Sequence, residues 1–155
     1  MKTRPAPARW SRRLDVTVLL GIAALHVAWG EGTSWPLPDH ATLNRTVLGR
    51  EGADPTAGFG QGRPACYAVA GALTAAAALV AGRPRSLPGL RRLGVGGVVA
   101  VLTVRGLAGV SGRTRLLVPM ATGETFTRLD RRCYGPLCLL LAALSARSLG
   151  RPAPR

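Results

Sequence analysis

Two side chains of opposite charge are the first candidates for chemistry in this sequence. Arg105 lies well inside an apolar stretch, where a charge is costly and marks either a functional site or a structural ion pair. Its candidate partners are the carboxylates of Asp130, Glu124 and Glu31. A buried arginine–carboxylate pair can fix helix packing and can also hold an anionic ligand. The long side chain also allows the guanidinium to reach the lipid headgroups, so all three roles of Arg105 stay open.

Further candidates come from an imidazole and two aromatic rings. His26 could act as an acid or base, but a single histidine on an apolar stretch can equally be a hydrogen-bonded core residue. Catalysis would require His26 and a carboxylate within about 3 Å of a common site, and we assign no catalytic residue. With two histidines in the chain we expect no metal and no other cofactor. The candidate ligand-binding residues are His26, Trp29, Arg105, Asp130 and Tyr134.

Four apolar stretches must position these side chains. They cover residues 14–30, 64–82, 93–110 and 133–149. Each is close to the length at which an α-helix crosses a hydrocarbon layer. We therefore expect one all-α domain over residues 1–155, a bundle of four transmembrane helices with flexible basic tails at 1–13 and 150–155. A cleaved signal peptide is the alternative for the first stretch, but a histidine and a tryptophan near its end favour an uncleaved anchor.

The basic residues between the stretches predict an orientation. The net charge is +14, and all but one of the 21 basic residues are arginines. Twelve basic residues lie in the two tails and the middle link, against eight in the other two links. The positive-inside rule then places both termini in the cytoplasm. The composition, rich in Arg, Gly, Pro and Ala, is typical of a GC-rich bacterial genome, so we expect the bacterial inner membrane. No nucleic-acid partner is expected, because no binding module accompanies the charge.

The long first outer link, residues 31–63, is expected to hold one short helix. Asp39 is a suitable N-cap for a helix from His40 to Leu48, which Gly49 would end. The remainder is rich in glycine and has the composition of an irregular loop. A link of this length is either disordered or a lid over a site.

Small residues predict close helix contacts. Ala68, Ala72 and Ala76 recur at four-residue spacing in the second stretch. The third stretch carries Gly94, Gly97, Gly106 and Gly109. Such positions let helices approach within the chain, and they also suit a partner helix or a second copy of the chain.

Three cysteines, Cys66, Cys133 and Cys138, lack the spacing of a thioredoxin-like motif or a zinc ribbon. Cys66 and Cys133 each begin an apolar stretch, so a disulfide between them is one interpretation in an oxidising compartment. Packing as small apolar residues is the interpretation that we favour.

Two motifs resemble those of a known family. Residues 25–32, Leu-His-Val-Ala-Trp-Gly-Glu-Gly, are followed by Trp35 and resemble a histidine–tryptophan–glycine signature. Residues 126–139, Phe-Thr-Arg-Leu-Asp-Arg-Arg-Cys-Tyr-Gly-Pro-Leu-Cys-Leu, resemble that family's ending, and Arg105 matches an arginine in its third helix. The family is a group of small bacterial integral membrane proteins, common in actinobacteria and catalogued as domain of unknown function 3995.

The resemblance implies a four-span membrane fold and no known activity. Carried over residue by residue, it marks His26, Trp29, Arg105, Asp130, Tyr134 and Pro136. The chain departs from the family's pattern at Gly135, where serine is usual, and at Glu31 within the tryptophan–glycine motif. A role for a hydroxyl group at position 135 is thereby put in doubt.

Three hypotheses about function follow. The preferred one is a non-enzymatic membrane protein, structural or a subunit of a larger assembly. The second is a small-molecule or lipid-binding protein with an outward-facing pocket around Arg105 and Asp130. The third is a membrane enzyme that uses His26 on a lipophilic substrate. Under the predicted topology the candidate residues gather near the outer face, where they either enclose a pocket or satisfy one another.

Overall fold

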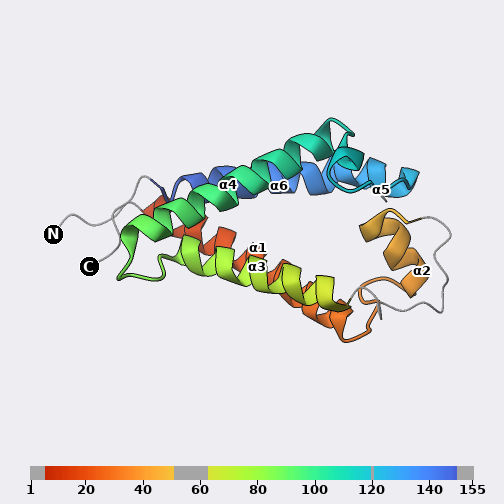
Figure 1. The fold of residues 1–155 in the computed structure, drawn as a ribbon, viewed down its shortest axis with the longest axis horizontal. Coiled ribbons are helices and arrows are strands. Elements are labelled where there is room, and N and C mark those ends of the chain that lie inside the picture. The colour runs from red at the N-terminus through yellow and green to blue at the C-terminus, as the bar shows by residue number, and fades with distance from the viewer. Residues whose placement is uncertain (1–5, 51–62, 120, 150–155) are drawn as a thin grey trace.

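The computed structural model describes residues 6–50, 63–119 and 121–149, with side chains from residue 10 onward. These residues contain helices and no strand, which confirms the all-α class. The long helices are α1 (Ala6–Gly30), α3 (Arg63–Ala81) and α4 (Pro88–Val110) (Figure 1). A fourth helical run consists of α5 (Glu124–Leu129), a π-helical segment (Asp130–Tyr134) and α6 (Gly135–Ala146).

Three of the described helices are long and apolar enough to cross a membrane. These candidate spans are Trp10–Gly30, Arg63–Ala81 and Pro88–Val110, and they match the first three predicted stretches. The third begins five residues earlier than predicted, because Pro88 suits the first turn of a helix. The fourth predicted stretch, 133–149, is regular α-helix only over the 12 residues of α6.

The predicted basic tails fall partly outside the described residues. Residues 6–13 belong to α1 rather than to a tail, whereas 1–5 and 150–155 are not described.

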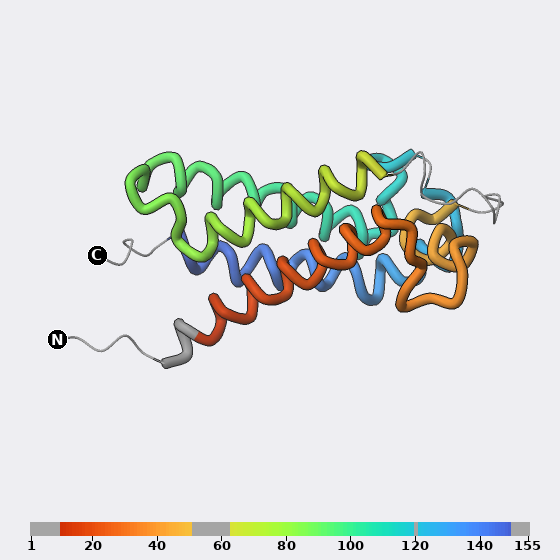
Figure 2. The backbone as a smooth tube through the Cα atoms, turned by 90° about the horizontal axis from the view of Figure 1, so that it is seen from below, coloured from red at the N-terminus to blue at the C-terminus, as the bar shows by residue number. Residues whose placement is uncertain are grey.

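The helices pack as two antiparallel pairs. α1 packs mainly on α3, and α4 packs mainly on α6 and the π-helical segment before it. Figures 1 and 2 show that α1 begins and α6 ends at the same end of the molecule, here called the terminal end. The pairs diverge toward the opposite end, here called the cap end, where α2 (His40–Leu43) and α5 lie (Figure 1). The core between the pairs consists of Leu19, Ala76, Ala77, Val80 and Leu141.

Three glycines let α4 and the fourth run approach closely. A Cβ atom on Gly106 would lie 2.7 Å from Cγ of Leu139, and one on Gly109 would lie 2.9 Å from Cα of Gly135. A Cβ on Gly135 would lie 2.8 Å from the backbone nitrogen of Val110. These distances leave no room for a side chain, so the serine usual in the resembled family could not be accommodated at Gly135 without a backbone shift.

The other predicted small-residue contacts are only partly formed. A Cβ on Gly94 would lie 2.8 Å from Leu79, whereas one on Gly97 would meet nothing within 4 Å. Ala76 is buried in the core, but Ala68 and Ala72 are exposed. One face of α3 is therefore free of contacts within the described chain.

The first link holds the predicted short helix. The Asp39 side chain accepts a hydrogen bond of 2.6 Å from the backbone N–H of Thr42 and caps α2. The helix continues in π geometry to Leu48, and Gly49 ends it in the left-handed region, with φ of +67°. The prediction is confirmed from cap to stop, because each residue has the local chemistry that its position requires. The glycine-rich remainder falls in 51–62, outside the described residues.

This cap segment, residues 39–50, connects the two helix pairs at the cap end. On one side, Leu43 is fully buried against Trp29 of α1 and Cys66 of α3. On the other side, the carbonyl oxygen of Gly49 accepts hydrogen bonds from the backbone N–H groups of residues 122 and 123, at 3.1 and 2.8 Å. The described part of the link is thus an ordered bridge.

Candidate functional site

Arg105 and Asp130 form a bidentate ion pair where α4 meets the π-helical segment. Nη2 of Arg105 donates to Oδ1 of Asp130 at 2.8 Å, and Nη1 donates to Oδ2 at 3.1 Å. The Asp130 side chain is 1% exposed and that of Arg105 is 27% exposed. Of the three predicted carboxylate partners, the structure selects Asp130.

Thr114 is a third member that sequence reasoning missed. It is buried in a short turn after α4, and its hydroxyl donates to Oδ2 of Asp130. A threonine in a polar link gives no signal of its own. We call Arg105, Asp130 and Thr114 the Arg105 clamp. Its carboxylate accepts three hydrogen bonds, which is the arrangement that makes a buried charge tolerable.

The π-helical segment helps to place this carboxylate. The backbone N–H of Gly135 donates to the carbonyl oxygen of Asp130, five residues earlier. Such widened turns occur mostly as single insertions within α-helices. A Cβ on Gly109 would lie 2.9 Å from Oδ1 of Asp130 and 3.1 Å from Nη1 of Arg105. The clamp therefore depends on a glycine in the facing helix.

His26 and Trp29 contact each other instead of the clamp. Their ring centroids are 5.0 Å apart. Nδ1 of His26 donates to the carbonyl oxygen of Ile22 at 2.9 Å, and Nε1 of the buried Trp29 donates to the carbonyl oxygen of Trp35 at 2.8 Å. The enzyme hypothesis requires a carboxylate close to His26. Within the described residues, the hydrogen bonds and ring contacts of His26 involve no carboxylate.

Tyr134 and Glu31 form separate contacts at the cap end. The Tyr134 hydroxyl donates to the carbonyl oxygen of Thr46 at 3.3 Å, so it attaches the cap segment to the fourth helical run. Glu31 accepts a hydrogen bond from the Tyr67 hydroxyl and lies 4.0 Å from Nη2 of Arg63. The predicted site residues thus share one end of the molecule but belong to separate sets of contacts.

Asp15 is a second buried acidic residue within a candidate span. Its side chain is inaccessible to solvent, and Oδ2 accepts a hydrogen bond of 2.8 Å from the Ser145 hydroxyl. Oδ1 has no hydrogen-bond partner among the described residues. Arg91 of α4 is buried as well. The signal was present in the sequence, because Asp15 is the second residue of the apolar stretch 14–30.

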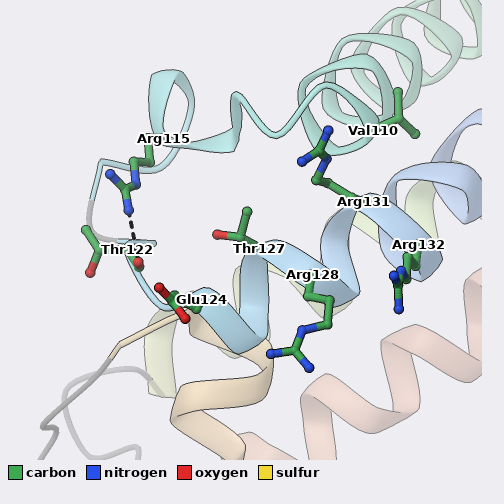
Figure 3. A pocket seen from close by; sticks show the side chains of 8 residues that line it. All are labelled: Val110, Arg115, Thr122, Glu124, Thr127, Arg128, Arg131 and Arg132. Carbon is green, nitrogen blue, oxygen red and sulfur yellow. Dashed lines mark hydrogen bonds between the residues drawn. The ribbon is translucent and has the colours of Figure 1, made fainter.

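A basic pocket of about 540 Å³ lies among α5, the π-helical segment and the link after α4 (Figure 3). Its lining residues are Val110, Arg115, Thr122, Glu124, Thr127, Arg128, Arg131 and Arg132. Three of the arginines come from α5 and the π-helical segment, and the fourth comes from the link after α4. Four guanidinium groups against one carboxylate make this pocket suited to an anion.

No group of three or more His, Cys, Asp or Glu side chains that could hold a metal occurs in the described part of the chain.

The three cysteines are free thiols, with Cys66 buried and Cys133 exposed. The structure therefore supports the packing interpretation of Cys66.

A family model matches residues 19–145, a range that contains every predicted ligand-binding residue. The family is described as a protein of unknown function (DUF3995), in agreement with the resemblance of the two motifs. No curated protein and no solved structure matches the chain.

Proposed function

The chain belongs to the DUF3995 family, and from this premise we propose that it is a non-enzymatic integral membrane protein, structural or a subunit of a larger assembly. One observation carries the proposal: the groups that could do chemistry are used in contacts within the protein. Arg105 and Asp130 join two helices, and Tyr134 attaches the cap segment. His26 has a backbone acceptor and an aromatic neighbour.

Four spans are part of the proposal. The fourth is the run from Glu124 to Ala146, which is as long as α4 and ends in the uncharged α6. The arginines of its π-helical segment would lie among the headgroups, where long cationic side chains are tolerated. An even number of spans returns the chain to its starting side. The basic-residue count then favours cytoplasmic termini and a cap end on the outside.

Exposed apolar side chains on α4 support contact with lipid. They are Leu90, Leu93, Val101, Val104 and Leu107, each more than half exposed. In water such a surface would be costly, whereas in a bilayer it faces acyl chains of matching polarity.

The free face of α3 supports assembly with a second copy. Ala68, Gly71, Ala72 and Ala75 are all exposed on this face. A Cβ on Gly71 would meet nothing within 4 Å. In a membrane, small residues four positions apart let two helix backbones approach closely and gain van der Waals contact.

The test is the oligomeric state of the purified chain in mild detergent, measured by light scattering. Gly71→Leu is expected to shift the wild-type oligomer to monomer. Gly21→Leu is the matched control, because Gly21 also lies on an open helix face of α1 and should leave the oligomer unchanged. A monomeric wild type, or equal masses for the two variants, would exclude assembly through α3.

A further inference from the structure

The basic pocket holds more positive charge than the described chain neutralises. Arg115 donates from Nη2 to the carbonyl oxygen of Thr122 at 3.0 Å, as Figure 3 shows. Arg128, Arg131 and Arg132 are exposed and form no ion pair within the residues that the structure describes. Asp130 lies among these arginines in sequence, but its carboxylate pairs with Arg105 in the clamp.

The spacing of these arginines brings like charges together. Arg128 lies three and four positions before Arg131 and Arg132 on one helical run, and all three side chains line the basic pocket. Like charges at this spacing destabilise a helix. An anion between them would remove the repulsion and accept paired hydrogen bonds, since the guanidinium fork matches phosphate oxygens.

An apolar groove adjoins the pocket at Val110. This second cavity, of about 480 Å³, shares Val110 with the basic pocket. Its other lining residues are Val104, Leu107, Ala108, Ser111, Arg113, Leu116 and Leu117. Leu107 and Leu116 are 54% and 79% exposed. Basic and apolar surfaces that meet at one residue favour an amphipathic anion over a free one.

We propose that these two cavities together bind an anionic phospholipid. Its phosphate would lie between Arg128, Arg131 and Arg132, and an acyl chain would lie along the groove from Val104 to Leu117. Arginine side chains are well suited to this role, because the planar guanidinium group can donate two parallel hydrogen bonds to phosphate oxygens. This inference goes beyond the proposed structural role and does not depend on the oligomeric state.

The test is native mass spectrometry of the full chain in detergent. Phosphatidylglycerol is compared with phosphatidylcholine of the same acyl chains, and inorganic phosphate with glycerophosphate. The pocket variant is R128Q/R131Q/R132Q. The control variant is R13Q/R92Q/R147Q, which removes the same charge from exposed arginines of α1, of α4 and of the turn after α6, at the terminal end. A groove variant, Leu116→Ser, changes an exposed side chain and keeps the charge.

We expect the wild type to retain phosphatidylglycerol about tenfold better than phosphatidylcholine, a difference of about 1.4 kcal/mol. The pocket variant should lose this preference, and the control variant should keep it. The groove variant should retain less of both lipids, because their acyl chains are the same. Equal loss in the pocket and control variants would overturn the site, because general charge attraction would then explain binding. Binding of inorganic phosphate as strong as that of phosphatidylglycerol would overturn the lipid.

Discussion

Arg105 and Asp130 pair through both oxygens of the carboxylate, with the shorter contact at 2.8 Å, across the interface of α4 and the fourth helical run. Since Thr114 donates to the same carboxylate, Asp130 has no accessible oxygen left for a ligand. The pair therefore connects two helices, and the neighbouring arginines are the groups open to a ligand.

The clamp should be needed for stability. Arg105→Ala leaves a buried carboxylate with only Thr114 as donor, and we expect a loss of about 3 kcal/mol in the free energy of unfolding. The double variant R105M/D130L should be more stable than Arg105→Ala, because no buried charge is left unpaired. Thermal unfolding in detergent measures both.

Arg113→Ala is the control for the clamp, because Arg113 is exposed and lies on the same side of the molecule. It should change stability by less than about 0.5 kcal/mol. An Arg105→Ala protein as stable as the Arg113→Ala protein would contradict the structural role of the pair.

Close packing of α4 should depend on Gly109. Gly109→Ala places a methyl group against Gly135 and the clamp, and overpacking of this kind costs about 1–3 kcal/mol. Gly97→Ala is the matched control on the same helix, because its Cβ would meet open space. The control should be neutral or slightly stabilising, since alanine favours helix more than glycine. Equal unfolding midpoints for the two variants would mean that the helices are not in close contact at Gly109.

The short helix from His40 to Leu48, here called the cap helix, and the all-α class could be predicted from the sequence because their signals are local. The Asp39 side chain suits the start of a helix, and the lack of a side chain at Gly49 suits its end. Arg105 was identifiable because a charge in an apolar stretch is conspicuous. The choice of Asp130 over Glu124 was not predictable, because it depends on how two helices distant in sequence align at Gly109.

Thr114, Ser145 and the basic pocket were beyond sequence reasoning for the same reason. Hydroxyl groups and surface arginines are common, and only packing shows which of them face a buried carboxylate or one another. Asp15 could have been noted, because its position within an apolar stretch is the same signal that identified Arg105.

The cap helix should depend on pH through Asp39. Hydrogen bonds to the Asp39 carboxylate from the backbone N–H of Thr42 and from its side-chain hydroxyl lower the pKa of Asp39 from its usual 3.8. A carboxyl group with a lowered pKa in the folded state stabilises that state above its unfolded pKa, and the benefit is lost as the pH falls through the folded pKa. We therefore expect the amide protons of residues 42–48 to lose protection, relative to their intrinsic exchange rates, below about pH 4.

Asp39→Asn separates this effect from general acid unfolding. Asparagine caps helices about as well as aspartate but does not titrate in this range. In this variant, the amide protons of the cap helix should keep the same protection on acidification, relative to those of α1. A similar acid-induced loss of protection in the variant and the wild type would assign the change to other groups.

The buried Asp15 should depend on a single hydroxyl group. Ser145 supplies the hydrogen bond of 2.8 Å to Oδ2, and Oδ1 has no hydrogen-bond partner in the described residues. Ser145→Ala therefore removes a donor to a carboxylate that water cannot reach, and we expect a loss of about 1–3 kcal/mol. The fold should retain its helix content, because α6 is otherwise apolar and alanine is a good helix former.

Ser111→Ala is the matched control for this change. The Ser111 hydroxyl also donates a hydrogen bond, at 2.7 Å, but to the carbonyl oxygen of Leu107 in its own helix and in an exposed position. Because water can replace that donor, the control should change the unfolding midpoint little. The variants should therefore separate clearly in thermal unfolding. If Ser145→Ala unfolds at the same temperature as the wild type, the hydrogen bond from Ser145 contributes nothing measurable to the stability of the buried Asp15.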